Sequence, residues 1–386
     1  MRILASHSPG EVRVALLDGD RLLEAWVERA GAPDGVGDLH RARVSAAAPA
    51  MAGAFVALGG GGTGFLPEKE MGEGSERALH EGRILVVRVT RAAQGGKGPR
   101  VSARLSPDEA ARAAAAGTGT APRLLARGPG AALRLALAHP DAPVETDGSG
   151  SAARLKAALG PDRVSFSGAA PVFDDDLEAE FEALAGPEAP LPGGGRVLVQ
   201  PTAALTAMDV DAGSVAGASR DRGAQARFNA AAVAEAARQV RLRNLAGPVL
   251  LDVAGLSRRE RERLAAPLAR ALGADPLVRL LGLGPLGLFE MQRRRVHPPL
   301  HEVLGWPPSP LTHGLAALRR GAREIASVPG RPRLALRAAP AVAAALAGAP
   351  DAMREMAEAA GRPLELRADP SLPPGGEVLE EARDGR

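Results

Sequence analysis

The feature that most constrains the fold is an alternation of apolar and polar residues in EVRVALLDGDRLLEAWVE, from Glu11 to Glu28. The alternation continues on both sides of Asp18-Gly19, a dipeptide that favours the tight turn of a β-hairpin. After a Gly-rich linker at residues 31–38, further short β-type runs follow, separated by Gly and Pro: HRARVSAA, GAFVALG, TGFLP and ILVVRVTRA. About five short strands at this spacing predict a small β-barrel of the OB type.

Downstream of Pro107 the pattern changes to alternating helices and strands, which is typical of α/β structure. Residues 191–213 predict two strands joined by a Pro-Thr turn, and a helix at about 228–244 precedes a buried strand that ends at Asp252. A basic helix and the strand GLFEMQRRR follow. The sequence as a whole therefore predicts an α+β multidomain protein.

The last part of the chain changes character after two consecutive prolines, Pro298 and Pro299. From Leu311 onward the pattern predicts a helix, a strand, two short helices and a further strand. The Pro/Gly-rich polar segment from about Pro370 is expected to be loose.

Composition excludes several kinds of chemistry. The chain has no Cys, so disulfides, thiolate metal sites and a Cys nucleophile are ruled out. The net charge is only +3, and the high pI of about 10.0 reflects the lack of Tyr and Cys, which leaves little to titrate between His and Lys. Lysine occurs only at Lys69, Lys97 and Lys156, so nearly all 48 basic residues are arginines. A biased genome explains this excess as well as function does, although arginine suits phosphate binding.

The first residues contain no apolar segment of signal-peptide length, and no uncharged run approaches the length of a membrane span. We therefore expect a cytoplasmic protein that makes no membrane contact.

Two aspartates, Asp209 and Asp211, lie at the end of the apolar run in ALTAMDVDAG. In a strand, residues i and i+2 point to the same face, where two like charges repel unless a cation or water lies between them. Asp252 ends another predicted strand, so Asp209 and Asp252 could converge on one Mg²⁺ ion. Mg²⁺ held by carboxylates polarises a phosphoryl oxygen and lowers the pKa of bound water, as phosphodiester hydrolysis requires. The alternative for such a motif is a solvated strand end or a helix cap.

Three segments together resemble the catalytic region of the ribonuclease E/G family: PGGGRVLVQPTAALTAMDVDAG, AARQVRLRNLAGPVLLDVAG and GLFEMQRRR. Upstream, GAFVALGGGGTGFLP and GGKGPRVSARLS agree with the barrel of that family. The resemblance runs from about Val12 to Pro299, and the part after Leu311 is similar to the small C-terminal domain of the family. It implies a Mg²⁺-dependent endoribonuclease that acts on single-stranded RNA.

The resemblance also implies a domain arrangement in which an OB-fold barrel is inserted in an RNase H-like domain and a DNase I-like catalytic domain follows. The expected domains are RNase H-like at 1–35 and 107–189, OB-fold at 36–106, DNase I-like at 190–300, and a small C-terminal domain with a loose tail at 301–386.

Residue by residue, Asp209 and Asp252 fall where the family coordinates Mg²⁺, and Asp211 falls where the family has Asn. We predict all three as catalytic residues. An Asn amide can donate a hydrogen bond, whereas an ionised Asp can only accept one. Asp211 could tighten the metal, recruit a second Mg²⁺ or act as a base; equally, it could weaken catalysis or be a tolerated change.

We expect RNA contacts both on the predicted barrel and in the predicted catalytic domain. Phe55, Phe65 and Lys97 fall on RNA-contacting positions of the family's barrel, where an exposed aromatic ring stacks on a base for ~1–3 kcal/mol. Arg238 and Arg241 share a helix face, as Arg293 and Arg295 share a strand face, so either pair could clamp the RNA backbone. From these pairs we predict contacts by Arg241 and by Arg293, the second because the family has an Arg there. The alternative is that these arginines form an ordinary solvated face.

Three departures from the family qualify the inference. Between Ser106 and Pro122 a short Ala/Gly stretch stands where the family carries a long subdomain that reads the 5′-monophosphate, so we expect 5′-end sensing to be lost. The Cys pair of the family's zinc link is absent, so no structural zinc and no zinc-linked dimer are expected, and the oligomeric state stays open. Residues 214–231 keep Asn229 but have Ala231 where the family usually has Glu.

Three functions are therefore in competition. The first is a shortened Mg²⁺-dependent endoribonuclease without end sensing. The second is a non-catalytic protein of the same descent that binds single-stranded RNA, an alternative that Asp211 and Ala231 favour. The third is a Mg²⁺-dependent phosphatase or DNA nuclease, because fold alone does not settle function.

Overall fold

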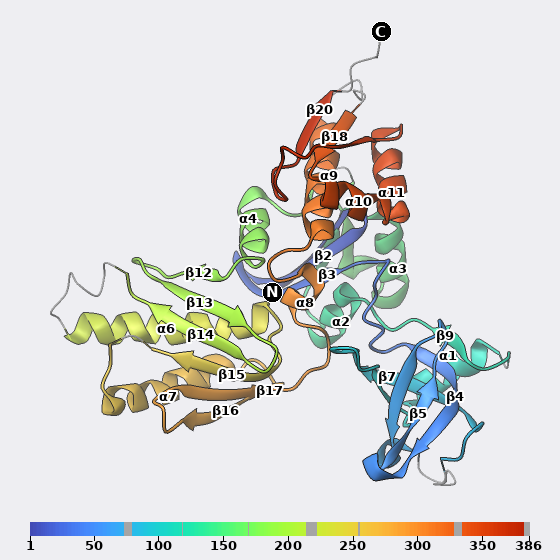
Figure 1. Ribbon diagram of the computed structural model, residues 1–386, viewed down its shortest axis with the longest axis horizontal. Helices are drawn as coiled ribbons and strands as arrows, with labels where there is room; N and C mark the ends of the chain where they lie inside the picture. The colour runs from blue at the N-terminus through green and yellow to red at the C-terminus, as the bar shows by residue number, and fades with distance from the viewer. Residues whose placement is uncertain are drawn as a thin grey trace. The chain divides into compact units, whose positions relative to one another are not determined.

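A computed structural model of the chain describes residues 1–72, 79–117, 119–168, 170–213, 222–253, 255–327 and 334–381. The described part contains four β-sheets and accompanying helices, which confirms the prediction of a mixed α+β protein (Figure 1). It divides into two compact units, one comprising 1–33, 131–294 and 299–386, and the other 34–130 and 295–298. None of the helices in the described ranges is both long and apolar enough to cross a membrane.

The second unit contains a closed five-stranded barrel of the predicted OB-like type. Its strands pair in the order β5-β6-β8-β7-β4, and a further pairing of β5 with β4 closes the ring. Val44, Val56, Leu66, Val87 and Val101 fill its interior. The elements are β4 (Leu39–Ala48), β5 (Gly53–Ala57), β6 (Thr63–Pro67), β7 (Ile84–Arg91), β8 (Arg100–Ser102), α1 (Pro107–Ala115) and β9 (Arg123–Ala126).

The structure corrects one part of the expected domain division. Residues 107–189 were expected in the RNase H-like domain, but β9 pairs antiparallel with β4 and extends the barrel sheet. Helix α1 contacts the same sheet, because the carboxylate of Glu109 accepts a hydrogen bond from Arg88 of β7 at 2.7 Å. Residues up to 130 therefore belong to the barrel unit, because their hydrogen-bond partners lie there.

The first unit begins with a five-stranded sheet of order β11-β10-β1-β2-β3. The predicted hairpin is confirmed as β2 and β3, which are joined at Gly19 and Asp20. Strand β1 was not predicted, because RILASHS lacks a regular alternation. The elements are β1 (Arg2–Ser8), β2 (Glu11–Asp18), β3 (Arg21–Glu28), α2 (Ala131–Ala138), β10 (Val144–Thr146), α3 (Ser149–Leu159), β11 (Val164–Phe166) and α4 (Asp175–Ala183).

The first unit continues with a six-stranded sheet of order β12-β13-β14-β15-β17-β16. The structure agrees with the predicted strands, which are β13, β14, β15 and β17, and with the turn between β13 and β14. It also contains the two predicted helices, α6 and α7, whereas β16 was not predicted. The elements are β12 (Glu188–Pro190), β13 (Arg196–Pro201), β14 (Thr206–Asp211), α6 (Arg222–Leu242), β15 (Gly247–Asp252), α7 (Arg258–Leu272), β16 (Val278–Leu283) and β17 (Phe289–Arg293).

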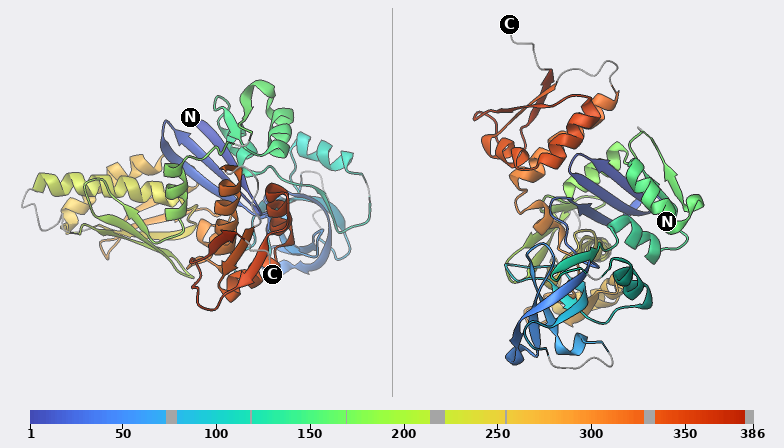
Figure 2. Two further views of the ribbon diagram at one scale, coloured as in Figure 1. Left: turned by 90° about the horizontal axis from the view of Figure 1, so that it is seen from above. Right: turned by 90° about the vertical axis from the view of Figure 1, so that its right-hand side faces the viewer.

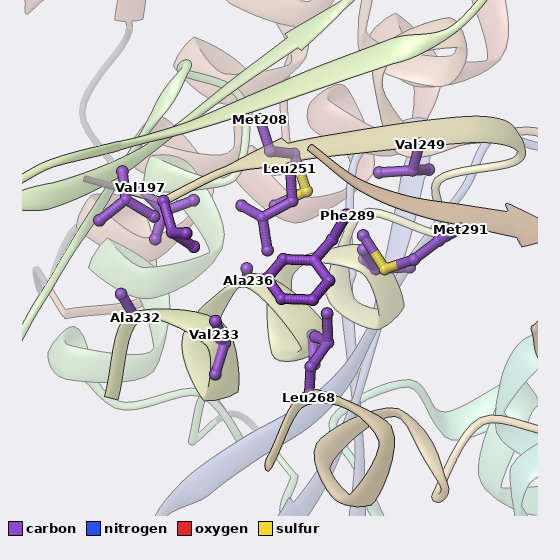
Figure 3. Close-up of a cluster of buried hydrophobic side chains, with 14 of the residues drawn as sticks. Val197, Met208, Ala232, Val233, Ala236, Val249, Leu251, Leu268, Phe289 and Met291 are labelled. Carbon is purple, nitrogen blue, oxygen red and sulfur yellow. The ribbon is translucent and has the colours of Figure 1, made fainter. Parts of the chain in front are cut away.

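Helices α6 and α7 cover one face of this six-stranded sheet. Alternate strand residues such as Met208, Leu251 and Phe289 point toward Val233 of α6 and Leu268 of α7, and together they form one buried core (Figure 3). Because side chains alternate along a strand, the residues between them point to the opposite face. On that face Gln200, Asp209 and Gln292 are exposed to solvent. We call this side of the sheet the open face.

The C-terminal region forms a three-stranded sheet of order β19-β18-β20 with helices along one side of it (Figure 2). The segment after Pro370 was expected to be loose, but Val378–Glu381 pairs antiparallel with β18 and Leu379 packs on the local core. The last five residues lie outside the described part of the chain. The elements are α8 (Leu300–Leu304), α9 (Pro310–Ser327), β18 (Leu334–Ala338), α10 (Pro340–Ala347), α11 (Pro350–Ala360), β19 (Glu365–Ala368) and β20 (Val378–Glu381).

Candidate active site on the six-stranded sheet

Asp209 and Asp252 lie side by side at the ends of two neighbouring strands. Strands β14 and β15 are parallel, and Asp209 is the register partner of Asp252. Both residues alternate with buried core residues, Met208 and Leu251, so both carboxylates lie on the open face. Neighbouring strands are about 4.8 Å apart, which brings the two carboxylates within reach of a single cation.

The electrostatics of this pair agree with its geometry. Burial, together with the negative charges of Asp252 and Asp211, raises the pKa of Asp209 above its usual value. Carboxylate oxygens are the ligands that Mg²⁺ prefers, and Mg²⁺ commonly binds one or two carboxylates while water and phosphate complete its shell. In the described residues no group of three or more His, Cys, Asp or Glu side chains is placed to hold a metal ion together. The two neighbouring carboxylates of Asp209 and Asp252 are a donor set that fits Mg²⁺.

Asp211 lies on the same face as Asp209 but is bound to other groups. Its Oδ2 atom accepts a hydrogen bond from Nε of Arg196 at 3.1 Å and forms an ion pair with Nη2 at 2.9 Å. Its Oδ1 atom accepts a hydrogen bond from the backbone N–H of Gly213 at 2.9 Å. The Gly213 hydrogen bond, opposed by slight burial and assisted by the Arg196 guanidinium, holds the pKa of Asp211 below its usual value. Asp211 is thus an ionised acceptor whose partners are already present in the protein.

Arg261 is a residue of this site that the sequence did not single out. Its Nη1 atom donates to Oδ1 of Asp252 at 2.6 Å and to the carbonyl of Gly287 at 2.8 Å, and its Nε atom donates to the carbonyl of Leu256 at 3.1 Å. Two backbone carbonyls therefore hold the guanidinium against Asp252. The sequence predicts a basic helix here, but it does not show which of the several arginines in that helix contacts Asp252.

Two of the three predicted contacts on the barrel lie together on β5 and β6. Phe55 and Phe65 are register partners, and their rings meet edge to face with centroids 5.6 Å apart. The Phe55 side chain is exposed, and the ring of Phe65 lies so close to Gly53 that a Cβ there would be 2.6 Å from it. Lys97 is exposed on the predicted Gly-rich hairpin, where it exchanges two backbone hydrogen bonds with Gln94.

The arginines predicted to clamp RNA have partners within the protein. Arg293 is only 4% exposed, and its guanidinium donates to Asp275 at 2.6 Å and to Asn244 at 2.7 Å. Arg241 donates from Nε to Glu24 of β3 at 3.1 Å.

The other member of each pair is held in the same way. Arg238 donates to Glu235 and Glu180, and Arg295 donates to the carbonyl of Ala93. These guanidiniums hold elements of the fold together, and the RNA contacts of Arg241 and Arg293 stay predictions.

The segment that carries the third departure from the family is only partly described. Residues 214–221 lie outside the described part of the chain. Asn229 is fully buried in α6, where its amide donates to the carbonyl of Gln225, and Ala231 is exposed on the same helix.

A cavity of about 890 Å³ lies elsewhere in the first unit, and its lining includes Arg13, Trp306, His313 and Arg320. None of the aspartates of the candidate site lines it.

Comparison with known proteins places these residues in a family. The sequence pattern of the Ribonuclease E/G family matches residues 152–296, a range that includes Asp209, Asp211 and Asp252. Ribonuclease G of Salmonella typhimurium (strain SL1344) is 25% identical over 474 residues, which covers 95% of this chain and 97% of that protein. Ribonuclease E of Nostoc sp. (strain PCC 7120) is 36% identical over 131 residues, covering 33% of this chain and 19% of that protein. Ribonuclease E of Escherichia coli (strain K12) is 24% identical over 386 residues, covering 76% of this chain and 36% of that protein. The chain belongs to the ribonuclease E/G family.

Proposed function

We propose that the protein is a Mg²⁺-dependent endoribonuclease that hydrolyses phosphodiester bonds in single-stranded RNA, in RNA processing or decay in the cytoplasm. The observation that carries this proposal is the register pairing of Asp209 with Asp252 on the open face of the six-stranded sheet. Relatives named ribonuclease G and ribonuclease E support the class of reaction.

In this proposal each residue of the site has a separate task. Asp209 and Asp252 hold the cation, which when bound polarises a phosphoryl oxygen and lowers the pKa of water. Arg261 acts on Asp252 by holding its carboxylate in one orientation, as hydrogen bonds to metal-binding carboxylates commonly do. Phe55 and Phe65 offer a stacking surface for bases, and Lys97 offers a charge to the RNA backbone.

The finer features of the family belong to the same proposal. We propose an RNase H-like part built on the sheet β11-β10-β1-β2-β3, a DNase I-like part built on the sheet with the aspartates, and a small C-terminal part. We also propose that the protein does not sense a 5′-monophosphate, because α1 and a short connection stand between β8 and β9. The alignment with ribonuclease G spans 474 residues against the 386 of this chain, which supports a shortened region.

The test is cleavage of a fluorogenic single-stranded RNA with Mg²⁺ and with EDTA. We expect cleavage only with Mg²⁺, and we expect Asp209→Asn and Asp252→Asn to lower the rate at least ~100-fold, because weaker perturbations of metal sites already cost 10–100-fold. Asp351→Asn, at an exposed carboxylate of α11, is the matched control and should leave the rate unchanged. Equal rates on 5′-monophosphate and 5′-hydroxyl RNA would support the loss of end sensing.

The second candidate is a non-catalytic protein that binds single-stranded RNA. The ionised Asp211 favours it, because a carboxylate beside the scissile phosphate repels the substrate. Tight RNA binding without cleavage at any Mg²⁺ concentration would select this candidate and exclude the nuclease.

A further inference from the structure

Arg196 lies directly beside the candidate site. It opens β13 and is the register partner of Asp211, while Leu198 of the same strand is the partner of Asp209. Val197 and Val199 point into the core, so Arg196 lies on the open face with the aspartates. Its side chain is 43% exposed and therefore accessible to a ligand.

The residue before Arg196 is a glycine that lies close to β14. Gly195 has φ +78°, a conformation that residues with a side chain rarely adopt. A Cβ at this position would lie 2.7 Å from the carbonyl oxygen of Asp211 and 3.0 Å from the ring of Phe228. Glycine thus lets β13 begin in close contact with β14, and this contact sets Arg196 against Asp211.

The guanidinium of Arg196 is held but not saturated. It has five N–H groups. In the described part of the chain, Nε donates to Asp211 and Nη1 donates to Glu188, each at 3.1 Å, while Nη2 forms an ion pair with Asp211 at 2.9 Å. Hydrogen bonds to the described residues therefore use two of the five N–H groups, and the others remain for a ligand.

The charges around the site indicate how Arg196 would affect the binding of a polynucleotide. Six charged side chains lie together at this site, joined by ion pairs or by the pairing of β14 with β15: Asp209, Asp211, Asp252, Glu188, Arg196 and Arg261. Four carboxylates and two guanidiniums carry a net charge of −2, which one divalent cation would neutralise. Without Arg196 the same group would remain negative even with the cation, and it would repel a polynucleotide.

We propose that Arg196, oriented by Asp211, binds a phosphate oxygen of the RNA at this site. Asp211 is then a positioning residue: it cannot donate a hydrogen bond, but it holds a group that can. This inference rests on the proposed function for the identity of the ligand, and it assigns to the Arg196–Asp211 pair the hydrogen-bond donation that Asp211 alone cannot supply.

The experiment measures RNA binding and cleavage for Arg196→Ala, Arg196→Lys, Asp211→Asn and the double variant Arg196→Ala/Asp211→Asn. Binding to fluorescent single-stranded RNA is followed by anisotropy in EDTA over a range of salt, so that this readout does not require a metal-loaded enzyme. Arg279→Ala, at an exposed arginine of the opposite edge strand β16, is the matched control. Thermal melting confirms that each variant is folded.

We expect Arg196→Ala to reduce the slope of log K against log salt by ~0.7, the value for one phosphate contact on a single strand. Cleavage should fall roughly 100-fold, as when a preorganised donor is removed from an active site. Arg196→Lys should keep most of the salt dependence but lose cleavage, because Lys cannot reproduce the planar fork. In the Asp211→Asn background, removal of Arg196 should cost less than in the natural chain, because the amide supplies a donor.

Two results would overturn the inference: an unchanged salt slope and cleavage rate in Arg196→Ala, or equal losses in Arg279→Ala. Failure of the proposed function looks different. A natural chain that never cleaves RNA but loses one phosphate contact in Arg196→Ala would retain the inference as a binding property and reject the nuclease.

Discussion

At the residue scale, residues of the same chemical type have different surroundings in the folded protein. Arg293 and Arg279 are both strand arginines, yet Arg293 is enclosed by Asp275 and Asn244 whereas Arg279 is exposed. Phe55 and Ile84 are both exposed apolar residues of the barrel unit, yet only Phe55 belongs to the aromatic pair.

Replacing Arg293 by Ala should destabilise the protein without a specific effect on RNA binding. The change leaves the buried carboxylate of Asp275 without its ion-pair partner, which typically costs ~3–5 kcal/mol. Chemical denaturation measures the loss, and Arg279→Ala should stay within about 0.5 kcal/mol of the natural chain. A stable Arg293→Ala variant with a reduced salt dependence of RNA binding would restore the predicted RNA contact.

Replacing Phe55 by Ala should weaken RNA binding while leaving the melting temperature nearly unchanged. The side chain is 38% exposed, and the stacking of one base on an aromatic ring contributes ~1–3 kcal/mol. Ile84→Ala, at a site that is 43% exposed on the same barrel, is the control for loss of apolar surface. An equal loss of affinity in both variants would reject stacking as the reason.

At the scale of elements, strand β20 shows how a segment of low sequence signal becomes ordered. VLEE is short and follows a Pro/Gly-rich stretch, so no local pattern predicts a strand. Pairing with β18 provides hydrogen-bond partners for the backbone of β20. The carboxylate of Glu380 also forms ion pairs with Arg367 at 3.0 Å and with Arg337 at 3.3 Å. Long-range partners therefore supply what local propensity lacks.

Removing the apolar anchor of β20 should destabilise the C-terminal sheet. Leu379 is half-buried on the core cluster, so we expect Leu379→Ala to cost ~1–2 kcal/mol, about half the value for a fully buried Leu. Val378→Ala, at the exposed neighbour in the same strand, should cost much less. Hydrogen exchange of the β18 amides reports the effect, and identical exchange in both variants would mean that β20 contributes no packing energy.

At the scale of the whole molecule, buried charges join segments that are far apart in the chain. Glu178 of α4 receives two hydrogen bonds from Arg13 of β2, and Arg319 and Arg323 of α9 also pair with it. Burial alone would raise the pKa of Glu178, but these three guanidiniums hold it below its ordinary value of 4.5. Arg319 also contacts Glu11 and Glu182, so the cluster connects the five-stranded sheet with the C-terminal region.

This cluster predicts a loss of stability in acid. A carboxylate whose pKa is lowered by folding contributes stability that is complete above its unfolded-state pKa and is lost as pH falls through the lower folded-state pKa. The free energy of unfolding should therefore decline as pH falls from 4.5. Glu178→Gln should be less stable near neutral pH and should show a shallower decline in acid. A decline of unchanged steepness in Glu178→Gln would assign the acid sensitivity to other carboxylates.

Local patterns in the sequence were sufficient for much of the architecture. Alternation around Asp18-Gly19 predicts the β2–β3 hairpin, and the spacing of short strands predicts the barrel, because both depend on residues only a few positions apart. The same period of two places Asp209 and Asp211 on one face of β14. The neighbouring position of Asp252 then requires only that β14 and β15 be adjacent and parallel.

The tertiary structure decided which arginines are enclosed by carboxylates of the protein and which keep exposed N–H groups. Arg241 meets Glu24 across 217 positions of sequence, and Arg319 meets Glu11 across 308, so no local pattern could identify these partners. The positions of Arg196 and Arg261 beside the aspartates depend in the same way on strand register and on the start of α7. An arginine carries the same charge in every context, but its function depends on whether folding brings a carboxylate to it or leaves its N–H groups for a ligand.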